Sequence, residues 1–333
     1  MPLVTKLTER LGIRHPIIQG GMHYVGYAPL AAAVSNAGAL GIVTALTQPS
    51  AEKLREELRA TRAMLASPDL PIGVNLTVLP QLKDVDYEGI MKVVLDEGVQ
   101  VVETAGSPKC AELWQHLRSA SPEIVIIHKC TTVRHALKAQ SLGVDMISLD
   151  GFDCAGHPGE ADVGNWVLQP VAARKLGIPY VTSGGVGDGK QLAASLALGA
   201  EGVNMGTRFM ATAEAPIHDD VKAALVAGDE NSTDLVMRSL NNTERVYKNA
   251  ASDEVRRLEA EFPGDISKIY HLVKGENYRR SFQETGDTSN SVWSCGPVMG
   301  LIDDVPTCEQ LVEGMVAEAE QIINQRLAGM VVK

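Results

Sequence analysis

The feature that most constrains this 333-residue chain is a repeated alternation of short apolar runs with helix-like segments. Eight such runs occur in the first two thirds of the sequence, and most are apolar throughout, without strict alternation of apolar and polar residues. This pattern is typical of parallel strands that are buried on both faces. The runs span residues 15–22, 40–46, 71–77, 99–106, 123–130, 145–151, 178–185 and 202–209.

The segments between these runs carry helix signals. Residues 50–65 begin with a serine that can cap a helix, and their apolar residues follow at helical spacing. Residues 131–143 end with a glycine, as helices commonly do, and residues 189–200 repeat that form before the eighth run. Eight consecutive strand–helix units predict an α/β fold, a (β/α)8 TIM barrel with right-handed crossovers throughout.

The helix that should close the barrel comes late in the sequence. Residues 308–327 form a long helical pattern with an apolar face made of Leu311, Met315, Ala319, Ile322 and Ile323. The sequence therefore predicts a mainly helical insertion between strand 8 and this closing C-terminal helix. We expect a barrel made of residues 1–212 and 296–333, with residues 213–295 capping its active-site end.

Composition and charge exclude several classes of function. The 30 Lys and Arg residues against 41 Asp and Glu residues give a net charge of −11, which repels nucleic acids and anionic membranes. The five cysteines show no C-x-x-C spacing, so we expect reduced thiols and neither a zinc site nor a redox pair. The start of the chain lacks a signal peptide, and no run approaches the ~20 apolar residues of a spanning helix, which predicts a cytoplasmic protein with no membrane segment.

Glycines and polar residues collect where the apolar runs end, which is the edge of a barrel at which active sites lie. After the seventh and eighth runs, Gly184, Gly185, Gly206 and Thr207 offer backbone amides that can approach phosphate oxygens. We expect a phosphate-binding corner here. The alternative is that these glycines only make tight turns.

Further side chains near strand ends are candidates for ligand contact. Lys129 ends the fifth run, and a lysine in a barrel mouth needs an anion to offset the cost of burial. Asn75 ends the third run and offers both a donor and an acceptor, while His23 follows the first run and is expected to line the mouth. A rim lysine, a turn-forming asparagine and a structural histidine are the plain alternatives.

His157 lies in the glycine-rich segment DGFDCAGHPGE, residues 150–160, directly after the sixth run. An imidazole in this place can donate a hydrogen bond or move a proton near neutral pH. The acids of the segment and Cys154 lack a metal-ligand spacing, so no metal site is predicted.

Together these features resemble the nitronate monooxygenase family of FMN-dependent barrels, also called 2-nitropropane dioxygenases. The resemblance runs along the whole chain, from HPIIQGGM through GVNLT and HKCTTVRHA to SGGVGDGKQLAASLALGA, and includes STDLVMRSLNNTERVYKN and GLIDDVPTCEQLV. The segments DGFDCAGHPGE and ETAG resemble a branch that includes bacterial NADH:quinone reductases once named nitronate monooxygenases.

The resemblance implies a tightly but non-covalently bound FMN, with NADH as co-substrate. His157 would be the catalytic residue that faces the flavin where substrates stack, and Ser294 matches a family position near the substrate. The loop 77–87 resembles a gate over the flavin, with Gln81 as an NADH contact. The residues that the resemblance places around the cofactor are Gly21, Met22, Asn75, Lys129, Asp150, Ala155, Gly156, Gly184, Gly185, Gly206 and Thr207.

The resemblance makes an NADH:quinone reductase the leading expectation. Because no G-x-G-x-x-G motif follows a strand to form a separate dinucleotide site, NADH would stack directly on the flavin, which predicts ping-pong kinetics. The alternatives with a flavin are a nitronate monooxygenase, which oxidises alkyl nitronates with oxygen, and an enoyl-acyl-carrier-protein reductase. The expected phosphate-binding corner is also compatible with a barrel lyase or isomerase that uses no flavin, and with a non-catalytic ligand-binding barrel. The expected partners are small molecules, and a homodimer is compatible with the sequence.

Overall fold

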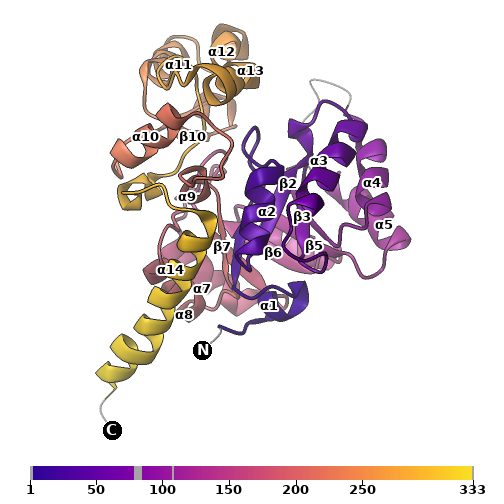
Figure 1. Cartoon of the computed structure of the whole chain (residues 1–333). Coiled ribbons are helices and arrows are strands. Elements are labelled where there is room, and N and C mark those ends of the chain that lie inside the picture. Colours follow the sequence, from indigo (N-terminus) through magenta and orange to yellow (C-terminus); the bar gives the residue numbers. More distant parts are fainter. Residues whose placement is uncertain (1–2, 79–84, 107–108, 332–333) are drawn as a thin grey trace.

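A computed structural model describes residues 3–78, 85–106 and 109–331 of the chain. Eight parallel strands pair in sequence order, and β8 pairs with β1 to close the barrel (Figure 1). The barrel predicted from the eight apolar runs is therefore confirmed. The strands are β1 (Ile17–Gln19), β2 (Leu40–Thr44), β3 (Ile72–Val78), β4 (Val101–Gly106), β5 (Val125–Cys130), β6 (Met146–Asp150), β7 (Tyr180–Ser183) and β8 (Val203–Met205).

Helices cover the outside of the barrel, and several of them begin at a residue whose side chain caps the helix. The Ser50 hydroxyl accepts a hydrogen bond from the amide of Lys53 at the start of α3, and Thr132 caps α6 in the same way. The helices before β8 are α1 (Lys6–Leu11), α2 (Ala28–Asn36), α3 (Ala51–Ala63), α4 (Tyr87–Asp96), α5 (Cys110–Ala120), α6 (Val133–Ser141), α7 (Asn165–Lys175) and α8 (Gly189–Ala197).

The late helix α14 (Cys308–Gln321) packs against α2 and α8 and so completes the outer ring, as the apolar face of residues 308–327 predicts. The eighth apolar run is shorter as a strand than its sequence indicates. The strand ends at Met205, and the short helix α9 (Thr207–Met210) follows at once because the amides of Phe209 and Met210 donate to the Gly206 carbonyl.

The insertion after α9 lies at the end of the molecule opposite the N-terminus, where its helices are orange in Figure 1. Between its helices the insertion contains an antiparallel hairpin that the sequence patterns did not indicate, β9 (Thr233–Val236) paired with β10 (Glu244–Tyr247). The insertion helices are α10 (Asp219–Ala227), α11 (Ala250–Glu261), α12 (Ile266–Val273) and α13 (Gly275–Arg280).

The insertion is packed into the barrel on one side. Val221 and Leu225 of α10, with Trp293, belong to the same hydrophobic cluster as Phe209 and as Met315 of α14. The hairpin, α11 and α12 form a smaller cluster of their own. The boundaries 213 and 295 remain predictions. None of the helices in the described ranges has the length and apolar character needed to cross a bilayer.

Candidate active site

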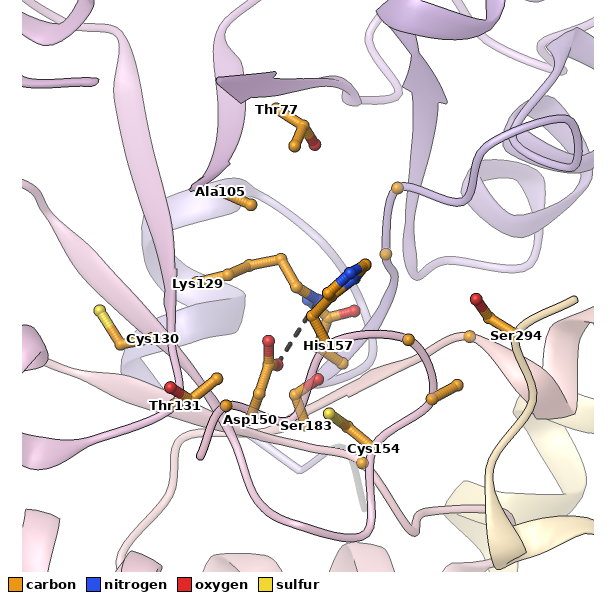
Figure 2. A pocket seen from close by; sticks show the side chains of 18 of the residues that line it. Thr77, Ala105, Lys129, Cys130, Thr131, Asp150, Cys154, His157, Ser183 and Ser294 are labelled. Carbon is orange, nitrogen blue, oxygen red and sulfur yellow. Dashed lines mark ion pairs between the residues drawn. The ribbon is translucent and has the colours of Figure 1, made fainter. Parts of the chain in front are cut away.

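A cavity of about 1030 Å³ opens where the strands end, between the barrel and the insertion (Figure 2). Its lining includes every expected site residue that the structure describes, because the carboxyl ends of parallel strands meet at one mouth. Gln81, the expected NADH contact, lies outside the described residues. The expected residues that line the cavity are Gly21, Met22, His23, Asn75, Lys129, Asp150, Ala155, Gly156, His157, Gly184, Gly185, Gly206, Thr207 and Ser294.

Behind the cavity lies a buried carboxylate that sequence reasoning missed. Glu103 of β4 is fully buried, and its Oε2 accepts hydrogen bonds from the Gly21 amide at 2.9 Å and from Asn75 Nδ2 at 2.7 Å. Its Oε1 accepts from Asn204 Nδ2 at 2.7 Å. One carboxylate thus links the segment that follows β1 with β3 and β8. The signal in the sequence was a lone acid inside the apolar run VQVVETAG.

Lys129 and Asp150 form an ion pair in the cavity, with Nζ and Oδ1 3.5 Å apart (Figure 2). Burial alone lowers the pKa of Lys129, but the carboxylates of Asp150 and Glu103 raise it by more, so the lysine stays charged. Burial raises the pKa of Asp150, and Lys129 opposes that shift. Asp150 Oδ1 is buried and accepts no hydrogen bond within the described part of the chain. Lys129 is the more exposed member of the pair and is therefore the one that can meet a polar ligand in the cavity.

The glycine corner presents free backbone donors. The amides of Gly184, Gly185 and Gly206 donate to no other described residue, whereas Asn165 Nδ2 occupies the carbonyls of Ser183 and Gly184 at 2.9 and 2.7 Å. Gly184 has φ of +87°, and a Cβ on it would lie 2.6 Å from the Cys154 amide nitrogen, so no larger residue fits. Three amides that line the cavity and have no partner among the described residues fit a phosphate group.

The loop that carries His157 is held by the insertion. The Gly156 amide donates to the Arg245 carbonyl at 3.1 Å, and the Arg245 amide donates back to Gly156 at 2.6 Å. The Arg245 guanidinium also donates to the Phe152 carbonyl at 3.0 Å and lies over the Phe152 ring. His157 itself is exposed at the rim, with Nε2 3.2 Å from Asn242 Nδ2. Sequence reasoning missed Arg245 and Asn242.

Ser294 is held by the same hairpin strand. Its hydroxyl donates to Glu244 Oε1 at 2.6 Å, and Ser294 forms a β-bridge with Val246. β10 therefore places His157 and Ser294 at one side of the cavity, although they lie 137 positions apart in the sequence.

Planar side chains form part of the cavity wall near the insertion. His23 Nδ1 lies 2.5 Å from the Tyr278 hydroxyl, and the rings of Tyr278 and Phe282 meet edge to face at 5.5 Å. Burial raises the pKa of Tyr278 well above its usual value, so the hydroxyl stays protonated. We call His23, Tyr278 and Phe282 the aromatic wall. Tyr278 and Phe282 were not expected from the sequence.

Two thiols line the cavity, those of Cys130 and Cys154. Burial raises the pKa of Cys130 to about 12 and raises that of Cys154 further, which keeps both as neutral thiols at physiological pH. The cavity therefore offers a cation, free amides, an exposed imidazole and flat apolar surface, and no thiolate nucleophile among these two cysteines.

Comparison with known proteins agrees with this arrangement. Residues 4–88 and 78–318 match a family model described as nitronate monooxygenase. A Rhodococcus jostii protein named (3aS,4S,5R,7aS)-5-hydroxy-7a-methyl-1-oxo-octahydro-1H-indene-4-carboxyl-CoA dehydrogenase is 33% identical over 95% of this chain and 96% of its own length. A nitronate monooxygenase of Paraburkholderia phytofirmans is 28% identical over 96% of both chains. The structure of FabK from Thermotoga maritima superposes with a TM-score of 0.88 and 30% identity, over 98% of this chain and 99% of that one.

Proposed function

Since this chain belongs to the nitronate monooxygenase family and is an oxidoreductase, we propose that it binds FMN and transfers reducing equivalents from NADH to a quinone. The observation that carries the proposal is that one cavity is lined by the glycine amides that could bind a phosphate, by the Lys129 cation and by the exposed His157. When bound, FMN would supply the two-electron redox chemistry that amino-acid side chains lack.

The described residues divide the work of holding such a cofactor. The free amides of Gly184, Gly185 and Gly206 would bind its phosphate, with Thr207 beside them. Lys129 keeps its positive charge and would stabilise negative charge on the polar edge of the ring system. Asn75 is oriented by Glu103 and would hydrogen-bond the same edge.

His157 is the group best placed to move a proton at the open side of the cavity. If Asn242 Nδ2 donates to His157 Nε2, the neutral imidazole carries its proton on Nδ1, which is then a donor. That donor would serve a quinone oxygen as it gains charge. The aromatic wall gives a flat acceptor ring a surface to stack on.

Donor and acceptor would use the same cavity in turn, which predicts ping-pong kinetics. The test is anaerobic mixing of the yellow protein with NADH while the flavin absorbance near ~450 nm is followed. Rapid loss of absorbance, with recovery when benzoquinone is added, supports the proposal. No loss with NADH or NADPH, but loss with propyl-2-nitronate, refutes it and assigns nitronate oxidation instead.

A second candidate is oxidation or reduction of an acyl thioester. It is favoured by the full-length similarity to a relative whose name gives a carboxyl-CoA substrate. In the same anaerobic assay, loss of flavin absorbance with a hydroxyacyl-CoA in the absence of NADH would support this second candidate.

A further inference from the structure

The cavity does not end at Lys129 but continues over Thr131 and Thr132 onto helix α6. There its lining includes three exposed basic side chains, which we call the cationic arm: Arg134, His135 and Lys138. Ala139 and Leu142 of the same stretch also line this part of the cavity and add apolar surface beside the basic groups.

The spacing of these residues makes the arm a continuous strip. Arg134, Lys138 and Leu142 follow one another at intervals of four residues, so they share one face of the helical segment and extend over ~12 Å. Arg134 Nη2 lies 3.2 Å from His135 Nε2, which places the guanidinium as donor and the imidazole as acceptor. The arm thus leads from the reaction site along the outside of the barrel.

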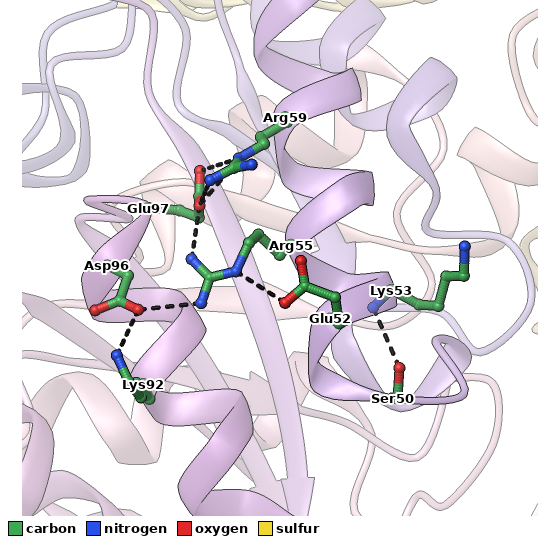
Figure 3. A network of polar contacts seen from close by, with 8 residues as sticks. All are labelled: Ser50, Glu52, Lys53, Arg55, Arg59, Lys92, Asp96 and Glu97. Carbon is green, nitrogen blue, oxygen red and sulfur yellow. Dashed lines mark hydrogen bonds and ion pairs between the residues drawn. The ribbon is translucent and has the colours of Figure 1, made fainter.

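The positive charges of Arg134 and Lys138 are not paired within the part of the chain that the structure describes. Arg134 and Lys138 form no ion pair with a carboxylate of the described residues. On α3, by contrast, Arg55 lies 2.8 Å from Glu97 and 3.0 Å from Asp96 at the end of α4 (Figure 3). In a chain with a net charge of −11, two unpaired cations beside a cavity point to an anionic ligand.

We infer that the cationic arm binds the phosphates of an adenine nucleotide that forms the far end of the substrate, the chemistry that NADH and CoA share. This inference rests on the proposed function, which places the reacting end of the substrate beside His157. Guanidinium and ammonium groups form charge-assisted hydrogen bonds with phosphate oxygens, and Leu142 gives the adenine ring an apolar contact. Because the arm is exposed, the nucleotide part of the substrate would remain in contact with solvent when bound there.

The test uses calorimetric titration of the yellow holoenzyme with two probes, CoA and NAD+. The variant is Arg134→Gln with Lys138→Gln, and the matched control is Arg174→Gln with Lys175→Gln, two exposed cations at the end of α7 outside the cavity lining. The arm variant should bind at least one probe about tenfold more weakly than wild type, with a shallower salt dependence. The control should bind like wild type.

The two probes separate the two sources of the nucleotide. Weaker binding of CoA alone identifies a CoA thioester, and weaker binding of NAD+ alone identifies the dinucleotide. Equal affinity of the arm variant and the control for both probes, or no binding of either probe to wild type, overturns the inference. The proposed function is judged independently, because saturating NADH should still bleach the arm variant if only the arm is at fault.

Discussion

Glu103→Gln exchanges one oxygen for an NH2 group at the centre of the barrel and leaves the shape of the side chain unchanged. The native carboxylate accepts three hydrogen bonds, two at Oε2 from Gly21 and Asn75 and one at Oε1 from Asn204. A glutamine has only one acceptor oxygen. Whichever way its amide turns, its NH2 group faces a donor, either Asn204 Nδ2 or the pair from Gly21 and Asn75.

The less costly orientation of the introduced amide places its oxygen toward Gly21 and Asn75, so these two hydrogen bonds remain and the one from Asn204 is lost. A hydrogen bond to a charged acceptor contributes about 1.5–3 kcal/mol, and the two that remain weaken because the acceptor is now neutral. Removing a buried charge offsets part of this loss. Asn204 still donates to Ser148 Oγ at 3.0 Å. We therefore expect Glu103→Gln to lower the free energy of unfolding by about 2–4 kcal/mol.

Urea unfolding of the holoenzyme measures this change as a lower midpoint at constant m-value. The control is Glu313→Gln, an exposed carboxylate 3.6 Å from Arg14, which should change the free energy of unfolding by less than about 0.5 kcal/mol. Glu103→Gln should also release flavin more readily, since Gly21 and Asn75 lose their support. Equal midpoints for the two variants would refute the role given to the buried carboxylate.

Three further substitutions test the cavity. His157→Ala should keep the flavin bound while quinone turnover falls about 100-fold, and full activity would contradict the role of the imidazole. Gly184→Ala should abolish flavin retention, since Gly184 has φ of +87°. The control is Gly314→Ala, where the added Cβ meets no atom within 4 Å; this variant should retain the flavin and raise the free energy of unfolding by up to ~1 kcal/mol. Lys129→Met should weaken flavin binding at least about tenfold and leave Asp150 unpaired. In the wild type, the pKa of Lys129 in the folded state is raised above its unfolded value of ~10.4. The lysine therefore keeps its charge below that unfolded value and loses it only as the pH rises through the higher folded value. Retention of the flavin should thus not decline through this group between about pH 6 and 10.

The barrel and much of the candidate site were predictable because they depend on local patterns. Each apolar run indicates a strand, and the ends of parallel strands must meet at one mouth, so Lys129 and Gly184 could be placed together before any contact was known. The family resemblance then assigned roles to these positions. Those roles, and that of His157, remain predictions.

The residues that were missed depend on contacts between distant parts of the chain. Glu103 is visible in the sequence as a lone acid in an apolar run, but its role depends on donors from the segment after β1, from β3 and from β8. The hairpin strands are four residues long and carry charged side chains, so their sequence lacks a clear strand period, and Arg245 finds its partner Gly156 far back in the chain. Tyr278 joins the cavity only because α13 folds against His23.

The pairing of β10 with the His157 loop has a consequence for how enzymes of this shape diversify. The cap and the loop share two backbone hydrogen bonds and the Arg245–Phe152 contact, so a replacement cap that lacks Arg245 loses the side-chain part of this junction. A chimera that receives a relative's cap must also receive residues 150–160 from the same parent. In this chain the two halves of that contact are separated in the sequence by β7 and β8, the last two strands of the barrel.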